Sequence, residues 1–332
     1  MAIGINHTVV SGTDTMERIE QYEAADFTRD GLLRAKGKRK VFVVFSTFGE
    51  REAELIHDKI RFLREQLGEF VDGILVSHRR TGEGEELTER RAREAWDGTR
   101  VLVCNGFEVP DMGAERGKGA DMRRALYHIN RSWKGGSPER DMVVVFLDAD
   151  VVPRFFGAHF VMGLVGAVLD GNDFARASFW RALGRVKKFV AQPLFSAIDH
   201  PALKGMTDYH YPLSGEVAGT LEFFNAVHFW QRYGVETGIN FDTCMDGYRV
   251  ADVNLGLYDH EHHGDIDIQK MAFGIIRTYL MQLRDYGIIT LADGAAISDT
   301  FKESFIDEGG RRQRLEFELA EKKYAPLKEI LG

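Results

Sequence analysis

Residues 142–153, MVVVFLDADVVP, decide the fold of this chain. Five consecutive apolar residues, 143–147, end abruptly in two carboxylates, Asp148 and Asp150, with Ala149 between them. An unbroken apolar run of this length is typical of a parallel strand that is buried on both faces. Open α/β sheets bind ligands at the carboxyl ends of such strands, where two acids can hold a divalent cation. The segment therefore predicts a metal site at a strand end, the alternative being a solvated turn.

The segments on either side of this strand alternate between strand and helix patterns. Buried strands are predicted at residues 40–48, 73–77 and 100–104, and amphipathic helices after Gly49, around residues 87–96 and from about residue 120. Further helices are predicted at 159–169 and 268–286. This order of elements implies an α/β fold with a parallel, doubly wound sheet.

Both ends of the chain are predicted to be helical. A charged helix over residues 16–36 would end at Gly37, and a second charged helix over 312–330 would form a tail against a partner subunit. The predicted organisation is a helical lead at 1–37, a nucleotide-binding half at 38–153, an acceptor-side half at 154–290 and a helical tail at 291–332. The two central halves are expected to share one sheet.

Composition restricts the class of protein. The 332 residues can bury a large core, 44% of them are hydrophobic, and no apolar run approaches the ~20 residues of a membrane span. The N-terminus lacks a secretory signal, and Cys104 and Cys244 are too isolated for a disulfide framework or a zinc site, so we expect a cytoplasmic protein. The net charge of -8 argues against general nucleic-acid binding. An anionic ligand would need a local basic cluster.

Two such clusters are present. Lys118 lies between Gly117 and Gly119 at the start of a predicted helix, where free backbone amides favour an anion, although a glycine before a helix is often only a turn. The second is either the solvated face of a helix or a clamp for a phosphorylated or carboxylated substrate. It consists of Arg181, Arg185, Lys187 and Lys188, beside Gly184.

Two further groups have both a structural and a functional interpretation. Glu236 lies between glycines and could be a helix cap, half of an ion pair or a catalytic acid. His260, His262 and His263 follow a short predicted strand. Neighbouring loop histidines often have no function, but one of them with the two aspartates would make a three-ligand cation site.

The order of these motifs resembles the retaining glycosyltransferases of the GT-A fold. The motifs are the GKG loop, the apolar strand ending in DAD, PLSGE at 212–216, YGVETG at 233–238 and a final NLG…H segment. The chain is most similar to the glucosyl-3-phosphoglycerate and mannosyl-3-phosphoglycerate synthases, over about residues 32–286. The resemblance implies a mainly parallel sheet flanked by helices, and C-terminal helices.

The resemblance also implies an activity. A hexose, glucose or mannose, would pass from a nucleotide-sugar such as UDP-glucose or GDP-mannose to the 2-hydroxyl of 3-phosphoglycerate, as a step towards compatible solutes. It implies Mg²⁺ or Mn²⁺ as cofactor, a small anionic acceptor as partner, and a homodimer.

Individual roles follow from the matching motif positions. The implied metal ligands are Asp150 and His260. The implied catalytic residues are Asp148, Lys118 and Glu236, the last orienting the glycerate hydroxyl and not acting as a nucleophile. The implied donor-binding residues are Ser46, Phe48, Glu50, Ser77, Lys118, Asp148, Ala149 and Leu213. The implied acceptor-binding residues are Gly184, Arg185, Lys187, Ser214 and His262.

The chain departs from the family pattern at several positions. Residues 77–81, SHRRT, replace an acidic, Ser-rich segment, and FSTFGE replaces a Pro-Ala-Leu-Asn-Glu type of strand end. Lys187 replaces a Thr, Tyr258 an Arg and His262 an Asn. Two alternatives therefore stay open: the same chemistry with another small acceptor, or a different class of protein, namely a non-catalytic nucleotide-sugar binder or a nucleotidyltransferase. The complete set of motif residues argues against the binder, and STFGERE lacks the basic, Gly-rich loop of a nucleotidyltransferase.

Overall fold

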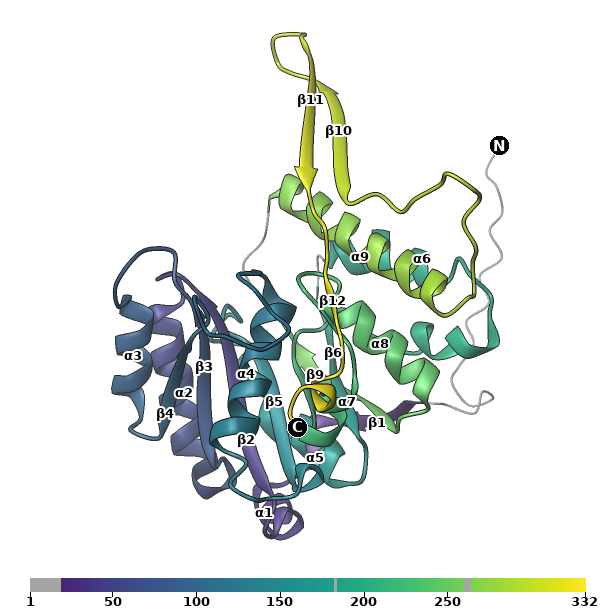
Figure 1. The fold of residues 1–332 in the computed structure, drawn as a ribbon. Coiled ribbons are helices and arrows are strands. Elements are labelled where there is room, and N and C mark those ends of the chain that lie inside the picture. Colours follow the sequence, from purple (N-terminus) through teal and green to yellow (C-terminus); the bar gives the residue numbers. More distant parts are fainter. Residues whose placement is uncertain (1–18, 182–183, 260–263) are drawn as a thin grey trace, which may run out of the picture.

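One eight-stranded sheet runs through the computed structural model, which describes residues 19–181, 184–259 and 264–332 (Figure 1). The strand order is β1-β9-β6-β7-β5-β2-β3-β4. All neighbours are parallel except β7, which is antiparallel to both β5 and β6. The strands are β1 Ile19–Glu23, β2 Lys40–Phe48, β3 Gly73–Arg79, β4 Thr99–Val103, β5 Met142–Asp148, β6 Phe174–Trp180, β7 Val217–Thr220 and β9 Val250–Leu257. The predicted α/β fold and the single sheet shared by both halves are confirmed.

Helices cover both faces of the sheet. They are α1 Arg29–Lys36, α2 Ala53–Leu67, α3 Leu87–Ala95, α4 Lys118–Ser132, α5 Ala158–Leu169, α6 Gln192–Phe195, α7 Leu221–Ala226, α8 Val235–Asp246 and α9 Asp265–Asp285. Apolar residues of α1, α2, α3 and α5 share one core, and those of α4, α7 and α8 share the core on the opposite face. A third, smaller core joins α6, α8 and α9. None of the helices in the described ranges is long and apolar enough to cross a bilayer.

Strand β5 is the centre of this arrangement because its side chains contribute to both cores. Val143, Val145 and Leu147 point into the core beneath α2 and α5, whereas Val144 and Phe146 point into the core beneath α4 and α7. Alternation of this kind is what a doubly buried strand requires, and it accounts for the continuous apolar run. The strand ends at Asp148, so both aspartates of the DAD segment lie at the carboxyl edge of the sheet.

The prediction of a helix over residues 16–36 is wrong in its first half. Residues Ile19–Glu23 form β1, which pairs in parallel with β9 at the edge of the main sheet. The helix begins only at Arg29, after the Thr28 hydroxyl accepts a hydrogen bond from the amide of Gly31. Its predicted end at Gly37 is confirmed. The free edge of β9, which is distant in sequence, decides the conformation of residues 19–23.

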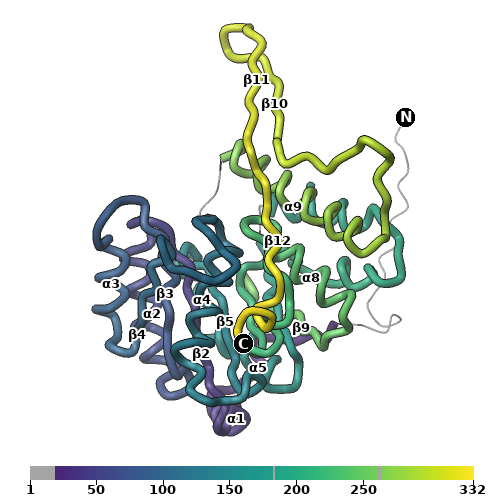
Figure 2. The backbone as a smooth tube through the Cα atoms, viewed as in Figure 1, coloured from purple at the N-terminus to yellow at the C-terminus, as the bar shows by residue number. Residues whose placement is uncertain are grey.

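The prediction of a C-terminal helix over residues 312–330 is also wrong. The strands β10 Thr300–Ile306 and β11 Arg312–Glu318 form an antiparallel hairpin, and β12 Lys323–Tyr324 pairs with β8 Phe229–Trp230. Figure 2 shows the chain returning from this hairpin along the body of the molecule to its C-terminus. Alternation of polar and apolar residues in RQRLEFE, 312–318, suits a strand, and Pro326 would interrupt a helix.

Truncation of Phe146 to alanine tests the role of β5. This side chain is fully buried and packs edge-on against Phe224, with ring centroids 5.4 Å apart. We expect Phe146→Ala to lower the free energy of unfolding by about 3–5 kcal/mol, measured in urea. The matched control Phe62→Ala removes a partly exposed ring from α2 and should cost much less. Equal losses in the two variants would contradict the central place of β5.

Candidate active site

A cavity of about 570 Å³ opens at the carboxyl edge of β2, β3 and β5. The N-termini of α4 and α8 close its far side, and the connection between β6 and β7 forms a further wall. Most of the residues assigned from sequence line this one cavity. They are Ser46, Phe48, Ser77, Lys118, Asp148, Ala149, Asp150, Gly184, Arg185, Lys187, Leu213, Ser214 and Glu236.

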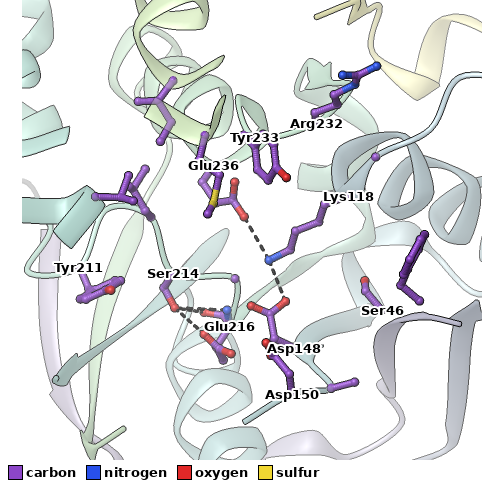
Figure 3. Close-up of a pocket in the computed structure, with 18 of the residues that line it drawn as sticks. Ser46, Lys118, Asp148, Asp150, Tyr211, Ser214, Glu216, Arg232, Tyr233 and Glu236 are labelled. Atoms are coloured by element: carbon purple, nitrogen blue, oxygen red, sulfur yellow. Dashed lines mark hydrogen bonds and ion pairs between the residues drawn. The ribbon is translucent and has the colours of Figure 1, made fainter. Parts of the chain in front are cut away.

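Lys118 is held between two carboxylates from different elements (Figure 3). Its Nζ lies 2.7 Å from Oδ1 of Asp148, at the end of β5, and 3.2 Å from Oε1 of Glu236, in the first turn of α8. Burial alone would lower the pKa of Lys118, but these two carboxylates outweigh it and the pKa is raised. Lys118 therefore stays protonated and provides a fixed positive charge at the DAD segment.

Glu216 is a buried acid close enough to Asp148 to be affected by its charge, and no role was predicted for it from the sequence. Its Oε2 accepts a 2.9 Å hydrogen bond from the Ser214 hydroxyl, and its Oε1 accepts a 2.8 Å bond from the Tyr258 hydroxyl. Burial and then the charge of Asp148 raise the pKa of Glu216. The signal that could have identified it is its position as the acid of the PLSGE motif, just before the apolar residues that form β7.

Lys59 is the second buried group that sequence reasoning missed. It projects from α2, where it follows the inward-facing Ile56, and its Nζ donates to the carbonyl oxygen of Ala149 between the two aspartates. Burial lowers its pKa to about 8, although the charge of Asp150 acts in the opposite direction. Lys59 could have been recognised from the sequence as a lysine on the apolar face of the helix that follows Gly49. Lys59 fixes the backbone of the DAD turn.

The two aspartates suit a hard divalent cation. Mg²⁺ is commonly held by one or two carboxylates together with substrate phosphates and water, so a pair at an open strand end fits it. Within the described ranges no cluster of three or more His, Cys, Asp or Glu side chains is arranged to hold a metal. The predicted ligand His260 and the predicted acceptor contact His262 lie outside the described residues.

Residues 77–81, the segment that differs from the family pattern, line the cavity at two positions, Ser77 and Arg79. The Arg79 Nε donates to Oδ2 of Asp121 at 2.8 Å, which places an ion pair in the wall. His78 is fully buried, where it hydrogen-bonds Thr47 and Glu86. The segment therefore combines a cavity wall with structural contacts.

Glu50 does not line the cavity. Its Oε1 accepts a 2.8 Å hydrogen bond from the backbone amide of Leu87, at the start of α3. Glu52, two residues later, does line the cavity and accepts a bond from the amide of Phe48. Burial raises the pKa of Glu52. The turn after β2 thus turns its second acid, not its first, towards the site.

Cations of the connection between β6 and β7 also line the cavity. Arg181, Arg185 and Lys187 line it there, beside Gly184, whose φ of 41° is left-handed. The Arg185 Nη1 lies 2.7 Å from Oδ1 of Asp265, and the Lys187 Nζ lies 5.2 Å from the ring centroid of Tyr211. Burial and then Lys188 lower the pKa of Lys187.

Known proteins resemble this chain in sequence and in fold. No family model matches the chain. It is 28% identical over 278 residues to the glucosyl-3-phosphoglycerate synthase of Petrotoga mobilis, which covers 78% of this chain and 79% of that protein. It is 29% identical over 276 residues to the enzyme of the same name from Mycolicibacterium smegmatis, covering 77% and 82% of the two chains.

Solved structures extend the similarity over nearly the whole chain. The mannosyl-3-phosphoglycerate synthase of Rubrobacter xylanophilus superimposes with a TM-score of 0.77 and 25% identity, covering 94% of this chain and 96% of that one. Glucosyl-3-phosphoglycerate synthase of Mycobacterium tuberculosis, solved with Mn²⁺, UDP and phosphoglyceric acid, gives 0.73 and 25%, covering 94% and 98%. The resemblance predicted from the motifs is therefore confirmed: the chain is a homologue of the glucosyl-3-phosphoglycerate synthases and has the GT-A fold that these enzymes share with mannosyl-3-phosphoglycerate synthase.

Proposed function

We propose that this protein is a metal-dependent glycosyltransferase that moves glucose or mannose from a nucleotide-sugar to the 2-hydroxyl of 3-phosphoglycerate, with retention at the sugar carbon. One observation carries the proposal. A single cavity is lined both by the aspartate pair with Lys118 and by Arg181, Arg185 and Lys187 of the β6–β7 connection. The first group suits a sugar diphosphate and the second a phosphorylated acid. Both substrates are cytoplasmic metabolites, so we propose that it acts there.

The acidic end supports the leaving-group chemistry. A cation held by Asp150, with Asp148 beside it, would supply charge neutralisation to the departing diphosphate. Lys118 carries a fixed ammonium at the same place, so it would bind the diphosphate oxygens as negative charge develops on them. Because the protein provides these charges before the substrate arrives, little reorganisation is needed during the reaction.

Glu236 fits an orienting role better than a nucleophilic one. Its Oε1 is paired with Lys118 at 3.2 Å, which stabilises the carboxylate but also reduces its nucleophilicity. In the proposed reaction the acceptor hydroxyl attacks from the side of the leaving group and gives its proton to a donor phosphate oxygen. No protein nucleophile is needed, and Glu236 would accept a hydrogen bond from the reacting hydroxyl.

A second candidate function, transfer to another small acceptor, is favoured by Tyr258. Its ring stacks on Phe179 with centroids 3.9 Å apart, and its hydroxyl donates to Glu216. This residue lines the cavity at a position where the related synthases are expected to carry an arginine. An uncharged phenol there removes one cation from the acceptor end and would accommodate a less highly charged acid.

We also propose that the enzyme is a homodimer. The support within this chain is the β10–β11 hairpin, which projects from the body of the molecule (Figure 1).

The first experiment is a matrix of donors and acceptors. UDP-glucose, GDP-glucose, ADP-glucose and GDP-mannose are each incubated with 3-phosphoglycerate, glycerate or glycerol phosphate, with Mg²⁺ or Mn²⁺ and with chelator. We expect metal-dependent glycosylation of 3-phosphoglycerate, detected by mass spectrometry. Product with glycerate alone would select the second candidate, and no transfer from any donor would refute both.

Substitution of Asp150 tests the metal assignment. Asp150→Ala should reduce metal-dependent turnover by roughly 10³-fold, since a bound cation contributes several kcal/mol to charge stabilisation. The matched control is Asp267→Ala, in the chain's second Asp-x-Asp pair, which begins α9 and does not line the cavity. It should leave turnover within a factor of about two. Retained activity in Asp150→Ala would remove this residue from the metal site.

Substitution of Arg185 tests the acceptor end. Arg185→Ala should raise KM for the acceptor by about 10-fold or more, because a hydrogen bond to a charged group contributes roughly 1.5–3 kcal/mol. The KM for the donor should change little. Lys188→Ala, on the same segment but outside the cavity lining, is the control. An acceptor KM that responds equally to both substitutions would indicate only a loss of general positive charge.

Substitution of Gly215 tests whether the Lys118–Asp148 ion pair must lie close to the backbone at this residue. A Cβ at this residue would overlap both the Nζ of Lys118 and the carboxylate of Asp148. Gly215→Ala should therefore displace the pair and reduce kcat by roughly 10²-fold, with little change in KM for the acceptor. Gly82→Ala, where a Cβ would meet nothing within 4 Å, is the control. Normal kcat in Gly215→Ala would show that the Lys118–Asp148 geometry can shift without cost.

A further inference from the structure

The chain that follows β11 returns along the body of the molecule and lies beside the connection between β8 and α8. Figures 1 and 2 show this return. Strand β12 pairs antiparallel with β8, and the amide of Gln231 donates to the carbonyl oxygen of Lys322 at 3.0 Å. The backbone of the C-terminal segment is thus fixed next to residues 231–234, which lead into α8.

Glu321 places its carboxyl group in this connection. Its side chain is buried, only 5% exposed, and it accepts hydrogen bonds from three consecutive backbone amides. Oε2 accepts from the amides of Arg232 at 3.2 Å and Gly234 at 3.1 Å, and Oε1 accepts from the amide of Tyr233 at 3.0 Å. Amides at the start of a helix have no acceptor within the helix. Glu321 supplies acceptors from a segment that is 87 residues distant in sequence from Gly234.

Two glycines leave room for this carboxyl group. A Cβ at Gly234 would lie 2.9 Å from Oε2 of Glu321, and a Cβ at Gly274 of α9 would lie 2.9 Å from Oε1. A Cβ at Gly234 would also collide with the hydroxyl of Thr278. A side chain at either glycine would displace the carboxyl group or the backbone around it. The start of α8, the middle of α9 and Glu321 therefore fit closely together.

The segment that Glu321 holds carries side chains of the cavity wall. Arg232, Tyr233 and Glu236 all line the cavity. Glu236 lies only two residues after Gly234, in the first turn of α8, and its Oε1 lies 3.2 Å from the Nζ of Lys118. Because no loop separates Gly234 from Glu236, a shift of the start of α8 would move this carboxylate directly.

The loop that carries Lys118 has a separate support. The amide of Ala120 donates to the carbonyl oxygen of Gln231 at 2.9 Å, and the Gln231 Nε2 donates to the carbonyl oxygen of Arg116 at 3.1 Å. These hydrogen bonds do not involve the side chain of Glu321. Removal of that side chain should therefore affect the Glu236 side of the ion pair and leave the Lys118 side in place.

We propose that Glu321 is a positioning residue for the transferase reaction, which holds the start of α8 so that Glu236 lies beside Lys118 and the reacting hydroxyl. Glu321 is not among the residues that line the cavity, so it acts through Glu236 and not on a substrate. The C-terminal segment thereby becomes part of the support of the active site. This inference rests on the proposed transferase activity and adds a residue that lies outside the cavity.

Two substitutions at Glu321 test this role. Glu321→Ala removes the acceptor of all three amides and should reduce kcat by about 10- to 100-fold, because a displacement of about 1 Å at a reacting group can have this effect. The KM for the donor should change little. Glu321→Gln retains one carbonyl oxygen, which can accept from the amides of Arg232 and Gly234, and should recover part of the lost kcat. An unchanged kcat in Glu321→Ala would overturn the proposal.

A double-mutant cycle with Glu236→Ala tests whether Glu321 acts through that side chain. If it does, Glu321→Ala should reduce kcat no further when residue 236 is already alanine, because residues that act as a unit are not additive. A general loss of stability would instead reduce kcat by the same factor in both backgrounds. Effects that multiply would therefore overturn the proposed route.

Hydrogen–deuterium exchange measures the contact without any activity. The amides of residues 232–234 should exchange faster in Glu321→Ala than in the unmodified chain, whereas those of β5 should stay protected and show that the variant is folded. The control is Glu329→Ala, which removes an exposed glutamate of the same C-terminal segment and should change neither kcat nor exchange. Equal exchange of residues 232–234 in Glu321→Ala and in the unmodified chain would refute the contact.

The results distinguish failure of this role from failure of the activity. If the unmodified chain transfers no sugar from any donor, the transferase assignment fails, and the positioning role fails with it whatever the exchange rates are. If the unmodified chain is active but its kcat does not respond to Glu321→Ala, the transferase assignment stands and only the positioning role is lost.

Discussion

The ammonium group of Lys118 is the point on which the site depends. It lies between the carboxylates of Asp148 and Glu236, and these three residues come from the start of α4, the end of β5 and the first turn of α8. The contact therefore joins the starts of α4 and α8 to the end of β5. Lys118 is thus the counter-charge of both carboxylates in a partly buried wall. The same positive charge is then available to a diphosphate.

Buried polar groups surround the contact of Lys118 with the two carboxylates. Glu216 accepts hydrogen bonds from Ser214 and Tyr258, and the fully buried Arg176 donates to the carbonyl oxygen of Ser214 at 2.6 Å. Lys59 holds the carbonyl of Ala149 from the opposite side. Hydrogen bonds between buried groups, such as those that Glu216 accepts on both of its carboxylate oxygens, restrict a site to one geometry. The DAD turn is thus fixed by cations on both sides, which suits a site that must receive a negatively charged donor.

Charge is distributed unevenly along the cavity, in a manner that the net charge of -8 conceals. The walls at the ends of β3 and β5 and at the start of α4 present the two aspartates of the DAD segment with three cations, Arg79, Arg116 and Lys118. The β6–β7 connection presents Arg181, Arg185 and Lys187. A metal–diphosphate complex suits the wall that combines the aspartate pair with cations, and a phosphorylated acid suits the cations of the β6–β7 connection. Both kinds of charge are therefore available to the two proposed substrates within one cavity.

The sequence by itself determined the alternating α/β order, the doubly buried strand β5 and its acidic end, and the GKG turn at the start of α4. These features depend on local periodicity and on the residue types that a strand end or helix start requires, so they can be recognised without tertiary contacts. The order of the motifs also identified the GT-A relatives. The tertiary structure alone decided that residues 19–23 and 312–318 are strands, since partners distant in sequence supply their hydrogen bonds. It likewise decided that Glu52 faces the cavity and Glu50 does not, and that Glu216 and Lys59 are buried beside the aspartates. The direction and burial of a side chain depend on the elements packed against it, and no local pattern contains that information.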